Sequence, residues 1–127
     1  MVLGLGIDLC EIARIARAIE KPRFVERMFT PAEQARLAEA TENRRTEIAA
    51  GMFAAKEAVS KALGTGFVGF GPADVEIVPD ASGRPVCALY RGAQTRAAAL
   101  AEGAPWRVFV SVTHETGMAA ATAILEK

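Results

Sequence analysis

Residues 43–66 have the sequence NRRTEIAAGMFAAKEAVSKALGTG, and this stretch contains the longest helix that the chain predicts. Apolar side chains recur there at helical spacing, at Ile48, Met52, Val59 and Leu63. We expect the helix to run over Asn43–Leu63 and to end at Gly64-Thr65-Gly66, because glycine readily adopts the conformation that closes a helix. The stretch therefore predicts a long helix that leads into a glycine-rich loop.

The segment before this helix predicts one strand and two helices. Val2–Leu9 alternates loosely and contains small glycines, a pattern that indicates a strand. The spacing changes to that of a helix over Glu11–Lys21, and Pro22 is expected to stop this helix. Thr30 begins the next helix, since its side chain can cap the first turn while Glu33 reaches back as in a capping box.

The segment after the long helix predicts further strands and one helix. We expect strands at Asp74–Val78, Pro85–Tyr90, Trp106–Thr113 and Met118–Leu125, turns at Asp80–Gly83 and His114–Gly117, and an alanine-rich helix at Gln94–Glu102. Consecutive strands joined by short turns indicate antiparallel pairing. The predicted fold class is α+β, an antiparallel sheet with helices packed on it, in a single domain over residues 1–127.

The composition is that of a globular protein. Of the 127 residues, 51% are hydrophobic and 24% are charged, with 15 basic and 15 acidic side chains. This balance excludes an intrinsically disordered chain and provides no net positive field for binding nucleic acid. No apolar run approaches the roughly 20 residues of a membrane helix, and no signal peptide is recognisable. We therefore expect a cytoplasmic protein with neither nucleic acid nor membrane as a partner.

Residue usage also bears on assembly and on cysteine chemistry. Alanine is abundant, whereas aromatic residues make up 6% of the chain, so that each side chain buries little area. A small domain of this kind gains from association, which favours an oligomer. Cys10 and Cys87 are too few and too isolated for a disulfide scaffold or a zinc site, and nothing near them indicates an activated thiolate.

The long helix carries the first candidate site. Phe53, Glu57 and Lys61 follow one another at intervals of four residues, so that they project from one face of the helix. One interpretation is an exposed Glu–Lys pair that stabilises the helix slightly. The other is a ligand cleft, because the aromatic side chain makes the face partly apolar and flexible glycines lie just beyond it.

Asp8 is the second candidate, at the end of the first strand. One interpretation is a cap for the helix that starts near Glu11. The other pairs Asp8 with Glu57 as oxygen ligands of a hard cation. Magnesium is typically held by one or two carboxylates together with water and substrate phosphates.

The only histidine, His114, ends a predicted strand. A lone histidine is usually structural or simply exposed. A functional one at this place would transfer a proton or donate a hydrogen bond to a phosphate.

The segment Glu11–Arg27 is locally basic, with five basic and three acidic residues in a chain without net charge. One interpretation is a solvated helix face. The other is a surface that steers an acidic protein partner. The basic residues are Arg14, Arg17, Lys21, Arg23 and Arg27.

Taken in order along the chain, these motifs resemble the holo-acyl-carrier-protein synthases, the small stand-alone type of 4′-phosphopantetheinyl transferase. The resemblance extends over nearly the whole chain, and an ordered set of motifs is far more specific than any one of them. The residues that carry it are Gly6-Ile7-Asp8, Glu11-Ile12, Arg14-Ile15, Phe24, Arg27, Phe29-Thr30, Glu33, the run FAAKEAVSKA at 53–62 and the run VSVTH at 110–114.

The resemblance implies a specific reaction. Members of this family move the 4′-phosphopantetheine arm of coenzyme A onto a serine of apo acyl carrier protein, in support of fatty acid biosynthesis, and release adenosine 3′,5′-bisphosphate. Magnesium bridges the pyrophosphate and two acidic side chains, which match Asp8 and Glu57. The family is trimeric and holds coenzyme A between subunits, and its first helix, here with Arg14, docks the acidic helix of the carrier protein.

Within that reaction the other candidates acquire roles. Lys61 would place positive charge on the leaving phosphate, and either Glu57 or a water that Asp8 and Glu57 orient would accept the serine proton. His114 lies where family members contact the ribose phosphate of coenzyme A. Gly64 and Gly66 would let the backbone approach the nucleotide, and Phe53 would form an apolar wall of the same cleft.

Two positions depart from the family pattern. Met52 stands where members often carry an arginine that helps to hold the ribose phosphate, and Glu115 follows the histidine where members tend to have a small hydroxyl residue. Two other functions therefore stay open beside the transferase. One is a non-catalytic module that binds a carrier protein through the basic helix, and the other is a metal-dependent phosphohydrolase that cleaves a nucleotide pyrophosphate with water.

Overall fold

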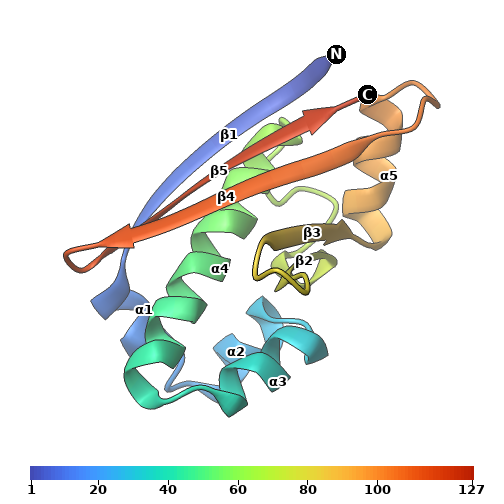
Figure 1. Ribbon diagram of the computed structural model, residues 1–127. Helices are drawn as coiled ribbons and strands as arrows, with labels where there is room; N and C mark the ends of the chain where they lie inside the picture. Colours follow the sequence, from blue (N-terminus) through green and yellow to red (C-terminus); the bar gives the residue numbers. More distant parts are fainter.

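The computed structural model describes residues 1–127 and contains five strands, five α-helices and one short 3-10 helix (Figure 1). The strands are β1 (Val2–Glu11), β2 (Val75–Pro79), β3 (Pro85–Leu89), β4 (Arg107–Glu115) and β5 (Met118–Glu126). The helices are α1 (Ile12–Ala18), α2 (Pro22–Met28), α3 (Pro31–Glu39), α4 (Glu42–Ala62) and α5 (Arg91–Leu100), with the 3-10 helix η1 at Pro72–Asp74. The α+β class expected from the sequence is confirmed.

The strands divide between two antiparallel sheets, where the sequence suggested one. A three-stranded sheet has the order β1-β5-β4, and β2 and β3 form a separate hairpin. In the larger sheet Asp8 of β1 lies opposite Ala121 of β5, which in turn lies opposite Val112 of β4. Strand β5 therefore separates the two strands that carry the candidate residues Asp8 and His114.

Helix α4 packs along one face of the three-stranded sheet, as Figure 1 shows. The contact is close because β1 presents glycines to it. A Cβ on Gly4 would overlap the carbonyl oxygen of Ala62, and a Cβ on Gly6 would overlap that of Ala58. Small side chains on α4 and β5 complete this closely packed layer, and many of the 24 residues of the core cluster are alanines. The sequence of β1 thus fixes how near α4 approaches Asp8.

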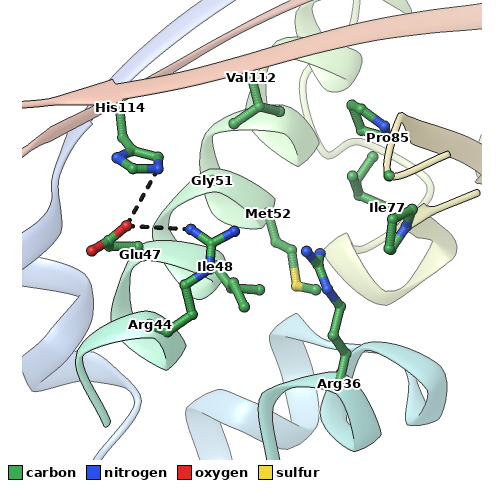
Figure 2. A pocket seen from close by; sticks show the side chains of 12 residues that line it. Arg36, Arg44, Glu47, Ile48, Gly51, Met52, Ile77, Pro85, Val112 and His114 are labelled. Carbon is green, nitrogen blue, oxygen red and sulfur yellow. Dashed lines mark hydrogen bonds and ion pairs between the residues drawn. The ribbon is translucent and has the colours of Figure 1, made fainter. Parts of the chain in front are cut away.

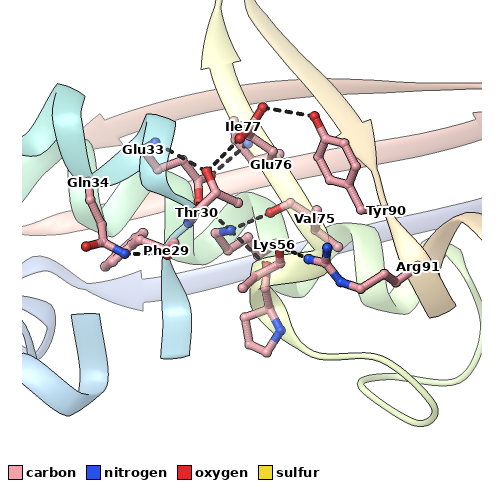
Figure 3. Close-up of polar contacts among 12 residues, drawn as sticks. Phe29, Thr30, Glu33, Gln34, Lys56, Val75, Glu76, Ile77, Tyr90 and Arg91 are labelled. Carbon is pink, nitrogen blue, oxygen red and sulfur yellow. Dashed lines mark hydrogen bonds and ion pairs between the residues drawn. The ribbon is translucent and has the colours of Figure 1, made fainter. Parts of the chain in front are cut away.

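A fully buried ion pair fastens the small hairpin to the rest of the fold (Figure 3). Lys56 Nζ of α4 lies 2.7 Å from Glu33 Oε1 of α3, and neither side chain is exposed. Lys56 also donates hydrogen bonds to the carbonyl oxygens of Pro72 and Val75, while the second Glu33 oxygen accepts one from the Ile77 N–H at 2.8 Å. Burial lowers the pKa of Lys56, and the charge of Glu33 opposes that shift. These two residues therefore join α3, α4, η1 and β2.

The expected capping box at the start of α3 is confirmed. The Thr30 N–H donates to Glu33 Oε1 at 2.8 Å, and the Glu33 N–H donates to Thr30 Oγ1 at 3.3 Å. The same glutamate therefore caps α3 and pairs with Lys56. A residue that sequence patterns assign to local structure is also a central part of the tertiary core.

Most element boundaries differ from the expectations by one or two residues, and three differences change the description of the fold. Helix α1 ends at Ala18, and Pro22 occupies the first turn of α2, a position that suits a residue without an N–H. Helix α5 begins at Arg91, three residues before the expected start at Gln94. His114 and Glu115 continue strand β4, so that the turn consists of Thr116 and Gly117, both with positive φ.

Both cysteines are free thiols. Burial raises the pKa of Cys10, and the nearby Asp8 carboxylate raises it further. Burial also raises the pKa of Cys87 to about 12. Neither residue is therefore an activated thiolate, in agreement with the sequence. The chain also has no helix with the length and apolar character needed to cross a bilayer.

Candidate active site

Asp8 and Lys61 meet where β1 passes the C-terminal half of α4. Alternation along β1 turns Asp8 toward the helix, on the same side as Gly4 and Gly6. Lys61 Nζ donates to Asp8 Oδ1 at 3.2 Å and to the carbonyl oxygen of Ile7 at 2.9 Å. The Asp8 side chain is 16% exposed, and the Lys61 side chain is 53% exposed. The pair therefore lies at the edge of the packed layer, open to solvent on one side.

The structure also decides between the two interpretations of Asp8. The N-cap of α1 is Glu11, and no side chain makes a cap hydrogen bond there. The interpretation of Asp8 as a helix cap is therefore wrong. Its carboxylate faces α4 instead.

Glu57 lies one turn before Lys61 on the same face of α4 and belongs to the same cluster. Burial raises the pKa of Glu57, and the negative charge of Asp8 raises it further, while Lys61 and Arg14 act in the opposite direction. Asp8, Lys61 and Arg14 therefore all lie near enough to Glu57 for their charges to act on its carboxyl. We refer to the two carboxylates, Asp8 and Glu57, as the acidic cluster, and to Lys61 and Arg14 as its two cations.

Phe53 and Arg14 form the wall next to this cluster. The Arg14 guanidinium lies 5.9 Å from the centre of the Phe53 ring, a distance typical of a cation–π contact. Phe53 is partly buried and packs against the core. Arg14 therefore belongs to the candidate site as much as to the basic surface where the sequence placed it.

The remaining basic candidates are exposed but do not form one helical stripe. Arg17 lies in the last turn of α1, and Arg27 lies in the last turn of α2. Lys21 is the residue before Pro22 and starts the second helix. The single helix expected over Glu11–Lys21 would have placed Arg14, Arg17 and Lys21 on one face, but the chain turns between two short helices. The exposed residues are Arg17, Lys21, Arg23 and Arg27.

The acidic cluster fits a magnesium ion of the kind that substrate phosphates help to hold. No group of three or more His, Cys, Asp or Glu side chains is placed to bind a metal by itself. Two carboxylates with open sides suit magnesium, which keeps several water or phosphate ligands. The charge of Asp8 raises the pKa of Glu57, and a divalent cation between the two would relieve that repulsion.

The glycines after α4 leave the backbone accessible. Gly64 and Gly66 have φ values of 81° and 63°, in the left-handed region that favours glycine. A Cβ on Gly66 would have no neighbour within 4 Å. The loop therefore has open space in front of its backbone, next to the end of the helix that carries Lys61.

His114 lies in a different part of the molecule, in a pocket of about 200 Å³ between α3, α4, β4 and the β2–β3 hairpin (Figure 2). Its Nε2 is 3.3 Å from Glu47 Oε2, and Arg44 Nη1 is 3.3 Å from the same oxygen. Figure 2 shows Glu47 between Arg44 and His114. Met52 also lines this pocket, with only 2% of its surface exposed.

This histidine pocket does not include Asp8, Glu57 or Lys61. Asp8 and His114 belong to the two outer strands, and two strand spacings correspond to about 10 Å. Within one chain the structure therefore brings the acidic cluster together but keeps His114 apart from it. Glu115 is exposed at the end of β4 and takes no part in the Glu47 contacts.

Sequence reasoning did not single out three charged residues of the histidine pocket, namely Arg36, Arg44 and Glu47. The spacing of Arg44 and Glu47 on one helix is a signal that the sequence contains. Their meeting with His114 and Arg36 depends on how β4 and α3 pack on α4, which local patterns do not encode.

Comparisons with known proteins agree with the geometry. The model of the 4′-phosphopantetheinyl transferase superfamily matches residues 4–121. The holo-[acyl-carrier-protein] synthase of Solidesulfovibrio magneticus is 45% identical over 99% of this chain and 99% of that protein. The crystal structure of the Neisseria meningitidis synthase has a TM-score of 0.85 at 32% identity, with 100% of both chains covered.

A second solved structure connects this fold with a nucleotide. The Bacillus anthracis holo-(acyl-carrier-protein) synthase, determined in complex with CoA (3′,5′-ADP), has a TM-score of 0.82 at 32% identity and covers 98% of this chain and 96% of its own. On these grounds the chain belongs to the 4′-phosphopantetheinyl transferase superfamily, in the family of the holo-[acyl-carrier-protein] synthases.

Proposed function

We propose that this chain transfers the 4′-phosphopantetheine group of coenzyme A to a serine of apo acyl carrier protein, in a magnesium-dependent reaction of fatty acid biosynthesis. The observation that carries the proposal is the acidic cluster, in which Asp8 pairs with Lys61 at 3.2 Å and lies near enough to Glu57 for its charge to raise the pKa of that carboxyl. Membership of the synthase family supports the choice of substrates. In this proposal residues 1–127 form a single transferase domain. We also expect the protein to be cytoplasmic.

The reaction is a displacement at phosphorus. The serine oxygen forms a bond to the phosphorus that carries pantetheine, and the bond from this phosphorus to the bridging oxygen breaks. The bridging oxygen leaves with adenosine 3′,5′-bisphosphate, and the serine proton passes to a base. Catalysis therefore needs charge neutralisation at the pyrophosphate and a proton acceptor near the serine.

Asp8 and Glu57 would hold the magnesium ion, which when bound neutralises pyrophosphate charge. Lys61 has an exposed ammonium group beside Asp8, from which it can reach a phosphate oxygen of the leaving group. Without the metal, burial and the charge of Asp8 raise the pKa of Glu57, and a bound magnesium ion would counteract this shift. The base in this proposal is Glu57 or a water that it orients together with Asp8.

Phe53 and the glycine loop would form the sides of the cleft. The Phe53 ring supplies apolar surface beside the charged groups, and Arg14 lies over its face. Gly66 would let the nucleotide approach the backbone, because a Cβ there has no neighbour within 4 Å. Gly64 would do the same beside the Arg96 side chain, which a Cβ at position 64 would meet at 3.5 Å. Exclusion of water from such a wall strengthens each charge interaction in the cleft.

We further propose that the active form is a trimer, with coenzyme A between subunits. The outer face of β1 presents three large apolar side chains to solvent, Leu5, Ile7 and Leu9, each more than 60% exposed. An uncovered apolar strand face of this kind indicates a protein interface. A neighbouring subunit would also explain the separation of the acidic cluster from His114, if one subunit supplies the cluster and the next supplies the histidine pocket.

Arg17, Lys21, Arg23 and Arg27 would dock the carrier protein. These side chains are exposed on α1, α2 and the turn between them. A localised basic surface on a chain with no net charge suits an acidic partner helix.

Intact-protein mass spectrometry tests the proposal. Apo acyl carrier protein is incubated with this protein, coenzyme A and magnesium, and the expected result is a mass gain of one phosphopantetheine that a chelator prevents. No gain with several carriers, together with carrier binding that survives the chelator, would support the binding module instead. Release of adenosine 3′,5′-bisphosphate without any carrier would support a phosphohydrolase.

A further inference from the structure

The histidine pocket combines apolar walls with an excess of positive charge. Ile48, Met52 and Val112 are among its apolar lining residues, and Ile77 and Pro85 close it from the hairpin side (Figure 2). Its charged residues come from three elements, namely Arg36 of α3, Arg44 and Glu47 of α4 and His114 of β4. Such a lining suits a flat apolar ring that carries an anionic substituent.

Arg44 and His114 already have an internal partner. Glu47 Oε2 lies 3.3 Å from Arg44 Nη1 and 3.3 Å from His114 Nε2. A bound anion would therefore compete with Glu47 for both groups. The net attraction that Arg44 and His114 can offer to a ligand is reduced accordingly.

Arg36 is different, because no carboxylate compensates its charge. Burial lowers the pKa of the Arg36 guanidinium, and the neighbouring Arg44 lowers it further, with no acidic group acting in the opposite direction. In Figure 2 its side chain rises from α3 into the pocket toward Met52. An arginine that is partly buried next to a second arginine is unfavourable by itself, and an anion between them would remove the cost.

We propose that Arg36 binds the 3′-phosphate on the ribose of coenzyme A and thereby makes the protein prefer coenzyme A over its 3′-dephospho form. This inference rests on the proposed function, since it assigns one part of the same co-substrate. Met52 is apolar and buried, so that position 52 contributes no charge to the pocket. Arg36 reaches the same pocket from another helix and supplies a guanidinium, whose planar fork matches phosphate geometry.

Equilibrium binding of two ligands, coenzyme A and 3′-dephospho-coenzyme A, tests this inference without any carrier protein. We expect Arg36→Gln to weaken coenzyme A binding by about tenfold or more in isothermal titration calorimetry, the effect of losing a charge-assisted hydrogen bond. Binding of the dephospho ligand should be unchanged. Arg36→Lys should recover part of the loss, because it keeps the charge but not the fork.

Arg107→Gln is the matched control. It removes one arginine from the same strand as His114, where Arg107 is 72% exposed and pairs with Glu126 at 2.9 Å. It should leave both affinities unchanged, which separates a local contact from a change in net charge. Equal thermal unfolding midpoints of the variants would show that Arg36→Gln keeps the fold.

Three results would overturn the inference. They are equal weakening of both ligands by Arg36→Gln, no weakening of either, and equal affinity of the unaltered protein for the two ligands. Failure of phosphopantetheine transfer in the mass assay would instead count against the proposed function. A selective loss of coenzyme A binding in Arg36→Gln would still hold in that case, so the two failures are distinguishable.

Discussion

Lys61 Nζ lies 3.2 Å from Asp8 Oδ1, although 53 positions separate the two residues along the chain. The contact exists because Gly4 and Gly6 let β1 approach α4 closely. Lys61 therefore acts as the counter-ion of Asp8 in the protein without ligands. A metal ion on Asp8 would release the ammonium group for a phosphate, which makes the pair a natural target for mutation.

Asp8→Asn should lower kcat/KM for carrier modification by at least about a hundredfold, comparable with the loss of other groups that stabilise transition-state charge. Magnesium with coenzyme A should raise the thermal unfolding midpoint of the unaltered protein, since a ligand that binds only the folded state stabilises it. The variant should show no such rise in the presence of magnesium. Circular dichroism should show the same fold for both.

Glu102→Gln is the control for this prediction. It removes one negative charge from a side chain that is 83% exposed, follows α5 and pairs with Lys127 rather than with any residue of the cluster. It should keep both the activity and the magnesium-dependent rise. Near-normal turnover in Asp8→Asn would contradict the metal assignment.

Glu57→Gln should change how stability depends on pH. Because burial and Asp8 raise the pKa of Glu57 in the folded state, the folded protein holds this proton more tightly than the unfolded chain. The contribution of Glu57 to stability is complete below its unfolded pKa and is lost as the pH rises through the raised value. Glu57→Gln does not lose this proton, so its stability relative to the unaltered protein should increase across that range.

Differential scanning fluorimetry with a chelator present measures this effect. At neutral pH the unfolding midpoint of Glu57→Gln should be about 1–3 °C above that of the unaltered protein, a small value because Glu57 is partly solvated. The difference should vanish in acid and should narrow in an Asp8→Asn background. A midpoint difference that does not vary with pH would show that the carboxyl group is not responsible.

Arg17→Glu should separate carrier docking from nucleotide binding. Arg17 is exposed on α1, so that reversing its charge repels an acidic partner while the acidic cluster stays intact. We expect the KM for the carrier protein to rise by about tenfold, with less effect at high salt, and the KM for coenzyme A to stay unchanged. Equal changes in the two constants would contradict a docking role.

Arg14→Glu serves as a contrast in the same assay. Arg14 stacks on Phe53, and its charge lowers the pKa of Glu57. Its replacement should therefore raise the KM for the carrier protein and the KM for coenzyme A. An effect on the carrier protein that greatly exceeds the effect on coenzyme A would place Arg14 with the docking residues alone.

Lys56→Met should destabilise the protein by about 3–5 kcal/mol, because it leaves the fully buried Glu33 carboxylate without its partner. The Pro72 and Val75 carbonyl oxygens would also lose a donor. Urea denaturation measures the free energy of unfolding. Arg44→Met removes a cation from an exposed pair on the same helix and should cost at most about 1 kcal/mol.

Local features of this fold follow from the sequence, whereas the meeting of distant residues does not. The capping box of Thr30 and Glu33 needs only four consecutive residues, and the long helix needs only its own periodicity. The salt bridge between Lys56 and Glu33 depends on the packing of α3 against α4, and no local sequence pattern predicts it. Pro22 shows the ambiguity directly, since a proline that ends one helix can equally begin the next.

The candidate site divides in the same way. Glu57 and Lys61 share a helical face, which spacing alone predicts, and the family resemblance supplied Asp8 as their partner. The histidine pocket joins four charged residues from α3, α4 and β4, and only His114 among them attracted notice in the sequence. Nothing in the sequence distinguishes Arg36 from the other arginines, and only the fold places it beside Arg44.

Gly6→Ala should damage both stability and activity through one clash. A Cβ at this position would overlap the carbonyl oxygen of Ala58, which is helix backbone and cannot move aside as a side chain could. Strand β1 must therefore shift away from α4, at a cost of about 1–3 kcal/mol or more. The shift carries Asp8 away from Glu57 and Lys61, so kcat should fall even at temperatures where the variant is fully folded. Gly71→Ala is the matched control for this prediction. A Cβ at position 71 has no neighbour within 4 Å, and the φ of Gly71, −115°, suits any residue. Urea denaturation and single-turnover transfer measured side by side would separate the two effects. A Gly6→Ala protein that is destabilised but fully active when folded would mean that the position of Asp8 does not depend on the close approach of β1 to α4.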